Sequence, residues 1–293
     1  MMFASAITGK TGVYGIIGFP VSHSLSPVMQ NAALQASGID GVYVPFAVAP
    51  DQLAAAIHGL RALQVCGFNV TIPHKTTIMP MLDRLAPSAV QAGAVNTVVN
   101  QEGGLIGHNT DGDGLVWSLE HDLDCRLEGA RVMLIGAGGA ARGALAALCR
   151  VGAKSVTVIN RTRIAADSLI ASFAAHFPET VLQACGFDPV LTTVLPQTDL
   201  VINATSLGMA GEKIEGLALA LLPDHAKVYD MVYNPAHTPL LQDACSRGLK
   251  AANGLGMLVA QGERAFFLWH GRAPATGVMR NVVESFSSVP AKA

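Results

Sequence analysis

Six polar side chains fall near the ends of expected strands in the first third of the chain. They are amide, hydroxyl, ammonium and carboxylate groups: Asn69, Thr71, Lys75, Asn96, Asn109 and Asp111. In an open α/β sheet, ligands bind at the carboxyl ends of the strands. An ammonium and a carboxylate placed there could relay a proton and stabilise a developing negative charge. The plainer interpretation is that these groups are solvated, or that Asp111 or Asp113 caps the next helix.

Lys75 favours the functional interpretation. It follows Pro73, which ends a strand, and it stands where a helix is expected to begin. The positive end of a helix dipole disfavours a lysine there. Local mismatches of this kind concentrate at functional sites.

A second polar cluster precedes an expected helix near the N-terminus. Ser26 is predicted as the N-cap and Pro27 as the first helical residue, and Ser22, His23 and Ser24 lie just before them. Hydroxyl groups at a helix N-terminus suit a small carboxylate. From the residues alone, a simple helix cap and a carboxylate site are equally good interpretations.

A glycine turn lies between an apolar strand and an apolar helical segment in the middle of the chain. Gly136, Gly138 and Ala141 have the G-x-G-x-x-G/A spacing, with Gly139 and Ala140 inside the same turn. Gly136 permits the tight turn, and Gly138 lets the backbone approach a pyrophosphate at the helix N-terminus. Because strand, turn and helix are all present, we predict a dinucleotide site rather than an ordinary strand-to-helix turn.

The residues after the next strand, Ser155–Ile159, indicate which dinucleotide binds. An NAD-binding chain would carry an acidic residue where this chain has Asn160, and Arg161, Thr162 and Arg163 follow. A guanidinium can grip a 2′-phosphate with two hydrogen bonds, whereas a carboxylate would repel it. The sequence therefore predicts NADP; the alternative is an arginine that faces water.

Composition limits the class of protein. The 293 residues are 51% apolar with a net charge of −2, which predicts about two globular domains and no nucleic-acid partner. No leader or membrane segment and no metal-ligand pattern is evident, so we expect a cytoplasmic protein without a metal. The odd number of scattered cysteines predicts small core residues in a reducing compartment: Cys66, Cys125, Cys149, Cys185 and Cys245.

Strand and helix patterns alternate along the chain and predict an α/β fold with parallel sheets. In the first half, the expected strands are 13–17, 43–46 and 67–70, the helices are 51–63 and 79–92, and a hairpin joins 97–100 to 105–106. In the second half, strands are expected at 132–135, 155–159, 200–203 and 228–231, a helix restarts at Thr238-Pro239, and helices follow at 257–271 and 273–287.

The motifs GFPVSHSLSP, NVTIPHK, GAVNT and GHNTDGDG, followed by the glycine turn, NRT, NATSLG and DMVYNP, resemble those of the shikimate dehydrogenase family. The resemblance implies an N-terminal α/β substrate domain (1–110), which the returning C-terminal helices (256–293) complete. It also implies a Rossmann-type NADP-binding domain (111–255) and a hinged cleft. The implied reaction is the reversible NADPH-dependent reduction of 3-dehydroshikimate to shikimate, on the route to chorismate and the aromatic amino acids.

The resemblance also assigns residues to roles, with Lys75 and Asp111 as the catalytic pair. The implied substrate-binding residues are Ser24, Ser26, Asn69, Thr71, Lys75, Asn96, Asp111, Tyr233 and Gln261. The implied coenzyme-binding residues are Gly136, Gly138, Gly139, Ala140, Asn160, Arg161, Thr162, Arg163, Thr205, Ser206, Met231, Gly254 and Met257.

One departure and several alternatives remain open. Ala165 stands where relatives often carry a second basic residue, which bears on strictness for NADP. A quinate/shikimate or aminoshikimate dehydrogenase is the near alternative, although serine at both 24 and 26 favours shikimate. A non-catalytic shikimate or dinucleotide sensor would be expected to lose Lys75 or Asp111. A methylene-folate dehydrogenase would have a similar two-domain layout but would not explain the motifs SHSLSP and NTD together. For the oligomeric state, either a monomer or a homodimer is expected.

Overall fold

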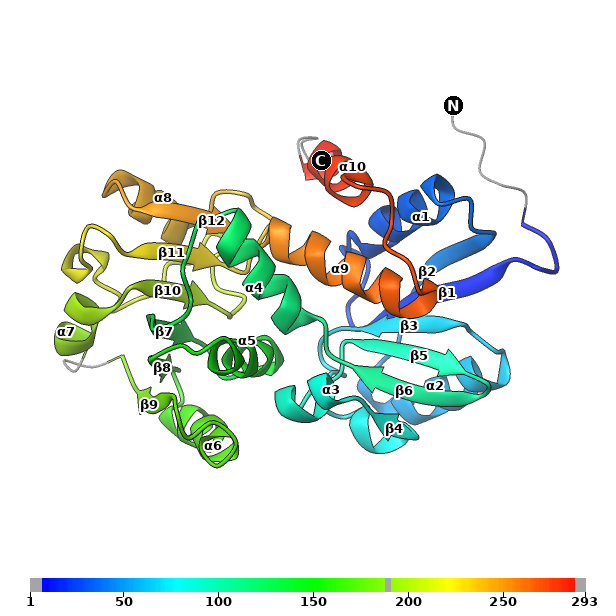
Figure 1. Ribbon diagram of the computed structural model, residues 1–293, viewed down its shortest axis with the longest axis horizontal. Helices are drawn as coiled ribbons and strands as arrows, with labels where there is room; N and C mark the ends of the chain where they lie inside the picture. The colour runs from blue at the N-terminus through cyan, green and yellow to red at the C-terminus, as the bar shows by residue number, and fades with distance from the viewer. Residues whose placement is uncertain (1–6, 188–190, 288–293) are drawn as a thin grey trace. The chain divides into compact units, whose positions relative to one another are not determined.

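The structure is a computed structural model that describes residues 7–187 and 191–287 (Figure 1). The chain divides into two compact units, Met1–Thr110 with Val259–Ala293, and Asp111–Leu258. The outermost ends of the expected substrate domain, residues 1–6 and 288–293, lie outside the described residues. Each unit is built on a six-stranded sheet with helices packed on it.

The sheet of the first unit has the strand order β2-β1-β3-β5-β6-β4. Its strands are β1 (Gly12–Gly18), β2 (Gly41–Ala47), β3 (Gly67–Val70), β4 (Arg84–Leu85), β5 (Thr97–Gln101) and β6 (Gly104–His108). β5 runs antiparallel to both β3 and β6. The expected parallel pairing is found between β1 and its neighbours β2 and β3, and the expected hairpin makes β5 and β6 antiparallel.

One helix of 16 residues, α9, and several shorter ones cover this sheet. They are α1 (Ser26–Ala36), η1 (Pro50–Gln52), α2 (Leu53–Ala62), η2 (Met79–Met81), α3 (Pro87–Ala92), α9 (Leu255–His270) and α10 (Val278–Ser287). The predicted helix from 273 begins only at Val278, because Pro274 and Gly277, with φ +77°, precede it. Ile17, Phe68 and Val98 are fully buried in the core beneath these helices.

The prediction of one helix over 79–92 is wrong. Only η2 and α3 are helical, and β4 lies between them. The Asp83 carboxylate accepts the Leu105 N–H at 2.6 Å, and the Ala86 N–H donates to the Gly107 carbonyl at 2.8 Å. Pairing with β6 thus outweighs the local helix tendency.

Residues 72–78 form turns, so Lys75 does not begin a helix, and the predicted conflict with a helix dipole does not exist.

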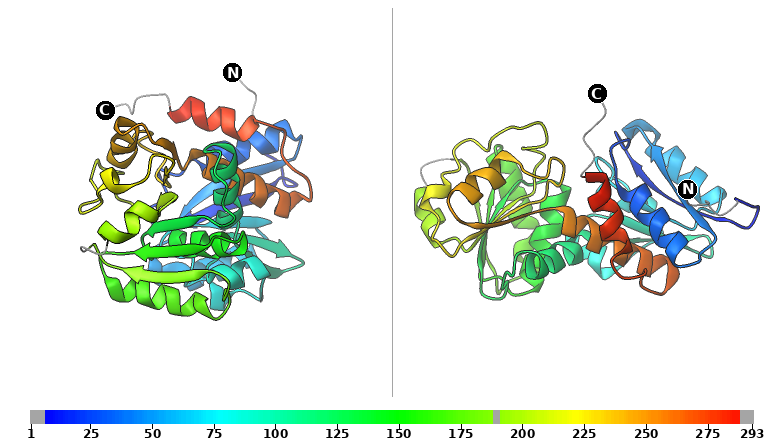
Figure 2. Two further views of the ribbon diagram at one scale, coloured as in Figure 1. Left: turned by 60° about the vertical axis from the view of Figure 1, so that its left-hand side comes forward. Right: turned by 90° about the horizontal axis from the view of Figure 1, so that it is seen from above.

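The sheet of the second unit is parallel throughout, with the order β12-β11-β10-β7-β8-β9. Its strands are β7 (Arg131–Ile135), β8 (Ser155–Ile159), β9 (Val181–Cys185), β10 (Leu200–Asn203), β11 (Lys227–Asp230) and β12 (Lys250–Asn253). Its helices are α4 (Asp111–His121), α5 (Gly139–Arg150), α6 (Arg163–Ala174), α7 (Leu191–Val194), η3 (Leu195–Gln197), η4 (Leu219–Leu221) and α8 (Pro239–Ser246). This is the predicted Rossmann-type arrangement, and Figure 2 gives two further views.

The C-terminal segment returns to the sheet of the first unit. The Trp269 indole N–H donates to the Val98 carbonyl at 3.0 Å, and the Gln30 amide donates to the Gly262 carbonyl at 3.0 Å. α10 packs along α1. A Cβ on Gly67 would lie 2.3 Å from the Trp269 ring nitrogen, so only glycine leaves room for that indole.

The cysteines follow the expectation from composition only in part. All five cysteines are free thiols; Cys125, Cys149 and Cys185 are buried, but Cys245 is exposed on α8, so the core prediction is wrong for it. No helix within the described ranges is long and apolar enough to cross a membrane.

Candidate functional site

Most of the polar residues predicted in the first unit gather at one edge of its sheet. The pairs Ile17–Val70, Asn69–Thr97 and Thr97–His108 form rows across β1, β3, β5 and β6. Because β5 is antiparallel, its amino end meets the carboxyl ends of the other three strands. Residues just beyond these rows therefore share the edge: Thr71 after β3, Asn96 before β5, and Asn109 after β6.

A buried network of amides and hydroxyls fixes this edge. The Asn69 amide donates to the Asn96 carbonyl and to the Thr97 hydroxyl, both at 3.0 Å. The Thr97 hydroxyl donates to Asn96 Oδ1 at 3.1 Å. The hydroxyl of Tyr43 donates to Asn69 Oδ1 at 2.7 Å. All four side chains are at least 95% buried, and hydrogen bonds between fixed partners in such a place hold one orientation.

The same network reaches the start of the second unit along the chain. Asn96 Oδ1 accepts the Thr110 N–H at 2.8 Å, and the Asn96 amide donates to the Thr110 hydroxyl at 2.9 Å. Asn96 also donates to Gln261 Oε1 at 3.4 Å, which brings two predicted substrate residues together. Asp111 follows Thr110 directly, is 5% exposed and begins α4, where the helix dipole favours a carboxylate.

The serine cluster lies at the start of α1, but Ser26 does not cap the helix as predicted. Leu25 occupies the N-cap position without a side-chain cap, and Ser26 is the first helical residue, followed by Pro27. The hydroxyl of Ser26 is buried, whereas Ser24 is half-buried and its Oγ accepts the Ser26 N–H at 3.3 Å. Ser26 is therefore a buried residue of the first helical turn and not the cap of the helix.

Thr71 and Lys75 lie in the turns after β3. A Cβ on Gly18 would lie 2.3 Å from Thr71 Cγ2, so the glycine lets the end of β1 approach that side chain. The Lys75 carbonyl accepts the Val95 N–H at 2.7 Å, which ties the lysine backbone to the chain just before β5. The Lys75 side chain is half-buried.

In the second unit, the glycine turn has the form that its sequence predicts. Gly136 has φ +113°, and a Cβ there would lie 2.9 Å from Thr205 Cγ2. Gly138 is the N-cap of α5, and a Cβ on it would meet nothing within 4 Å. Gly139 begins the helix, followed by Ala140. The turn thus leaves open space in front of the N-terminus of a 12-residue helix, which suits a phosphate group.

The residues after β8 are exposed arginines around a short turn. The Asn160 amide donates to the Thr162 carbonyl at 2.9 Å, and Thr162 is the N-cap of α6. Arg163 lies 3.7 Å from Asp167 on the same helix. Arg161 is exposed and makes no hydrogen bond or ion pair within the described part of the chain. Its guanidinium is therefore available for an anionic ligand.

A second polar network holds the loops after β10 and β11. The Asn203 amide donates to Asp230 Oδ1 at 2.9 Å, and Asn203 Oδ1 accepts the N–H and the hydroxyl of Thr205. Asp230 also accepts the Thr238 hydroxyl at 2.6 Å and the Val232 N–H at 3.0 Å. Burial raises the pKa of the Asp230 carboxyl, and these three donors lower it in part. Thr238 caps α8 as predicted.

The remaining predicted coenzyme residues lie around these loops. Ser206 is exposed beside Thr205. A Cβ on Gly254 would lie 2.1 Å from the Met231 carbonyl oxygen, so this glycine allows the ends of β11 and β12 to meet. Met257 lies in the first turn of α9. Tyr233, predicted for the substrate, belongs to the same unit, and burial raises the pKa of its phenol.

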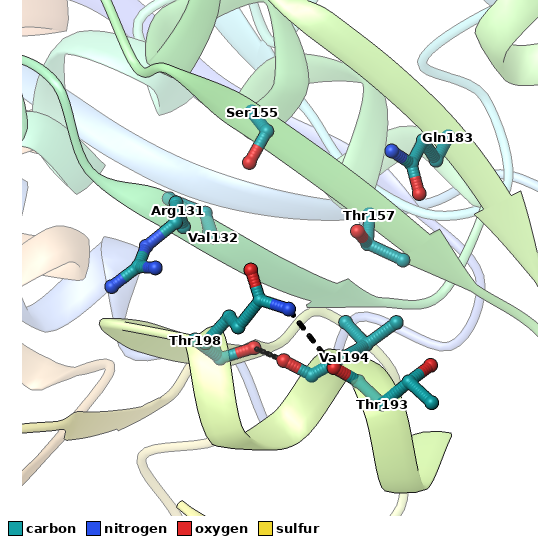
Figure 3. A pocket seen from close by; sticks show the side chains of 9 residues that line it. Arg131, Val132, Ser155, Thr157, Gln183, Thr193, Val194 and Thr198 are labelled. Carbon is teal, nitrogen blue, oxygen red and sulfur yellow. Dashed lines mark hydrogen bonds between the residues drawn. The ribbon is translucent and has the colours of Figure 1, made fainter. Parts of the chain in front are cut away.

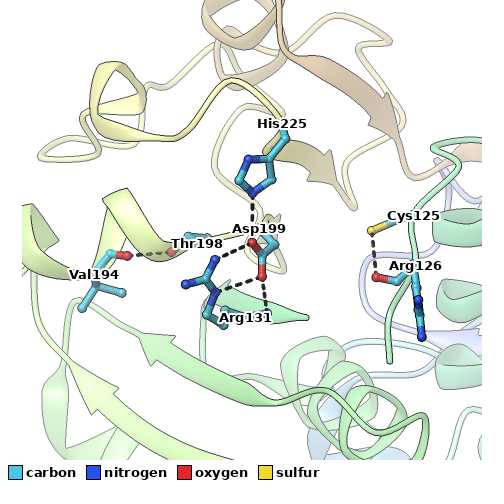
Figure 4. Close-up of polar contacts among 7 residues, drawn as sticks. All are labelled: Cys125, Arg126, Arg131, Val194, Thr198, Asp199 and His225. Carbon is cyan, nitrogen blue, oxygen red and sulfur yellow. Dashed lines mark hydrogen bonds and ion pairs between the residues drawn. The ribbon is translucent and has the colours of Figure 1, made fainter. Parts of the chain in front are cut away.

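The opposite edge of the second unit's sheet, where its parallel strands begin, is here called the amino edge. It carries a different set of groups. A pocket of about 250 Å³ opens there, lined by Arg131, Ser155, Thr157 and Thr198 among others (Figure 3). Beside it, the Arg131 guanidinium donates twice and its backbone N–H once to the Asp199 carboxylate, and His225 contacts the same group at 3.1 Å (Figure 4). None of the predicted site residues lies at this edge.

Sequence reasoning missed several residues of these networks. Tyr43, Thr97, Asn203 and Asp230 each lie within a predicted strand, but the sequence gives none of them a role in a site. Asn203 and Asp230 end parallel strands, and the edge rule that selected Asn69 would have found them. Tyr43 gave no such signal.

The combination of a Rossmann-type sheet, an open glycine turn and an exposed arginine after the second strand is typical of a dinucleotide-binding protein. Three family models match the chain: the shikimate dehydrogenase substrate binding domain at 16–98, shikimate / quinate 5-dehydrogenase at 119–227, and the shikimate 5'-dehydrogenase C-terminal domain at 254–284.

Individual relatives match over nearly the whole chain. The shikimate dehydrogenase (NADP(+)) of Geobacter metallireducens is 51% identical over 278 residues, which is 94% of this chain and 97% of that protein. A shikimate dehydrogenase solved in complex with NADP+ has a TM-score of 0.90 at 37% identity, covering 99% of this chain and 100% of that one. The Listeria monocytogenes shikimate 5-dehydrogenase, solved with shikimate and NAD, has a TM-score of 0.89 at 33% identity, covering 96% and 99%. The chain belongs to the shikimate dehydrogenase family.

Proposed function

We propose that the chain catalyses the reversible NADPH-dependent reduction of 3-dehydroshikimate to shikimate, and that Lys75 and Asp111 move the proton. Bound NADPH supplies a hydride to the carbonyl carbon. The Lys75 ammonium gives a proton to the carbonyl oxygen as negative charge develops there, and in the reverse direction the amine takes it back. We assign the Asp111 carboxylate to the same proton transfer, as the partner of Lys75.

The observation that carries this proposal is the buried polar network at the edge of the first sheet. It occurs in a chain that belongs to the shikimate dehydrogenase family. Asn69 and Asn96 are held by several hydrogen bonds each, and the same edge carries Thr71 and leads along the chain to Asp111. A polyhydroxy carboxylate needs donors and acceptors in fixed directions. We assign Ser24, Ser26 and Gln261 to the same substrate.

The coenzyme assignment is supported by the shape of the glycine turn. Gly138 leaves space for a pyrophosphate at the N-terminus of α5, and Arg161 can bind the 2′-phosphate. We assign Thr205, Ser206, Met231, Gly254 and Met257 to the rest of the coenzyme, with Asn160, Thr162 and Arg163 beside the adenosine ribose.

A steady-state assay of the full chain tests the proposal. Shikimate and quinate are each offered with NADP+ and NAD+, and kcat/KM is measured for the four combinations. We expect the highest value for shikimate with NADP+. A higher value for quinate would favour the quinate dehydrogenase alternative, and no turnover of either acid would contradict the proposed function.

A further inference from the structure

Tyr43 is a buried residue of β2 to which the proposed function gives no role. It is 2% exposed, and its hydroxyl donates to Asn69 Oδ1 at 2.7 Å. The Ser26 hydroxyl lies beside the same phenol and lowers the pKa of Tyr43, which burial raises well above its usual value. The phenol therefore lies between the first residue of α1 and the edge of β3, and it is hydrogen-bonded to the latter.

The backbone of Tyr43 is fixed to the same helix. The Asn31 side chain accepts the Tyr43 N–H at 2.9 Å and donates to the Tyr43 carbonyl at 2.8 Å. Asn31 also donates to the Pro27 carbonyl at 2.8 Å, within the first turn of α1. The start of α1 is thus attached to Tyr43 at two points, which restricts rotation of the helix relative to the strand.

The other partner of the phenol is rigid. Asn69 donates to the Asn96 carbonyl and to Thr97. Because its amide group is satisfied on both sides, Asn69 has one stable orientation, and it can act as a fixed reference for the hydroxyl of Tyr43.

We propose that Tyr43 is a positioning residue that sets the direction of the Ser26 hydroxyl relative to Asn69 and the substrate-binding edge. This inference rests on the proposed function, because it takes Ser26 to bind the substrate. Without the phenol hydroxyl, Asn69 Oδ1 loses a buried donor and the Ser26 hydroxyl loses its polar neighbour. The serine then has to be oriented by the substrate itself, which weakens binding.

Tyr43→Phe removes only the hydroxyl. The ring packs against Trp269 with centroids 6.0 Å apart, and phenylalanine keeps that contact. Tyr229→Phe is a matched control in the second unit: Tyr229 is fully buried, and its hydroxyl donates to the Ser118 hydroxyl at 2.8 Å. Both variants lose one buried hydrogen bond, but only one of them loses a bond at the proposed substrate edge.

We expect Tyr43→Phe to raise the KM for shikimate by about 3- to 10-fold, and to leave the KM for NADP+ within about twofold. Tyr229→Phe should leave the KM for shikimate within about twofold, although both variants lower the thermal midpoint. In a Ser26→Ala background, Tyr43→Phe should add little to the KM for shikimate, because the group through which it acts is gone.

Three outcomes decide between the two proposals. Absence of shikimate turnover by the unchanged protein would overturn the proposed function. Normal turnover with the same shikimate KM in Tyr43→Phe and Tyr229→Phe would overturn only the role of Tyr43. A Tyr43→Phe effect of equal size with and without Ser26 would also overturn it, because the phenol would then act by another route.

Discussion

The two units form their candidate binding edges in different ways. Hydrogen-bonded side chains hold the polar edge of the first sheet, whereas backbone conformation forms the glycine turn at the edge of the second sheet. At the first, Asn69, Thr97 and Asn96 bond to one another in the interior. At the second, Gly136 adopts φ +113°, and Gly138 leaves empty space in front of α5. The two edges therefore suit different ligands.

This difference follows from what each proposed ligand requires. A small acid with several hydroxyls is distinguished by the directions of individual hydrogen bonds, so its partners must be fixed by a network. A pyrophosphate needs N–H groups and room, which a glycine turn supplies without side chains. Charge pairs occur at the amino edge of the second sheet, where Arg131 meets Asp199.

The largest predicted effect concerns the lysine of the first unit. Lys75→Ala should lower kcat by about 10²- to 10⁴-fold with a modest change in the KM for shikimate, because it removes a proton donor that acts in the transition state. Steady-state kinetics in both directions measure this. Lys10→Ala, an exposed lysine of the same unit, serves as the control and should retain full turnover. Near-normal turnover of Lys75→Ala would contradict the proton relay.

The second prediction addresses the coenzyme side. Arg161→Ala should raise the KM for NADPH by about 10- to 100-fold, since charge-assisted hydrogen bonds to a phosphate are lost, and should change the KM for NADH by less than about threefold. Arg126→Ala, an exposed arginine paired with Glu128, is the control. Equal changes for both coenzymes would mean that Arg161 does not bind the 2′-phosphate.

The two glycines of the turn should behave differently. Gly138→Ala places a methyl group in open space at φ −86°, so we expect stability within about 1 kcal/mol of the unchanged protein and a KM for NADPH raised by about tenfold. Gly136→Ala requires a left-handed conformation and meets Thr205, and should lower stability by about 1–3 kcal/mol. Denaturant unfolding and coenzyme titration separate the two effects. An unchanged KM for Gly138→Ala would argue against pyrophosphate at this turn.

The smallest effect is expected at the amino edge. Partial burial raises the pKa of the Asp199 carboxyl. Hydrogen bonds from the Arg131 side chain and backbone and from His225 outweigh this effect and lower the pKa to about 2. A carboxyl whose pKa is lowered on folding stabilises the protein above its unfolded pKa, near 4, and this contribution is lost as pH falls toward 2. Asp199→Asn should therefore cost about 1–2 kcal/mol at pH 7 and progressively less below pH 4.

Unfolding curves at several pH values check this prediction, together with the KM values at pH 7. Those KM values should not change, because the ion pair lies at the opposite edge from the glycine turn. A raised KM for either ligand would break the distinction between the two edges of the second sheet.

Local rules predicted the parts of the fold that depend on neighbouring residues. The glycine turn and the Thr238 cap have the predicted form, because each needs only a few consecutive residues. The helix over 79–92 and the Ser26 cap are wrong, because pairing of Asp83 and Ala86 with β6 and the burial of Ser26 beside Tyr43 depend on distant parts of the chain. Tyr43 and Asn69 are 26 residues apart, so no local pattern could indicate their bond.

The return of Trp269 to the Val98 carbonyl has a consequence for how this polypeptide matures during synthesis. The second unit is contiguous and can be completed once residue 258 has left the ribosome. The residues around Gly67 emerge earlier, yet the space beside this glycine stays without its indole until residue 269 has been translated. The sheet that is translated before the second unit is therefore completed after it.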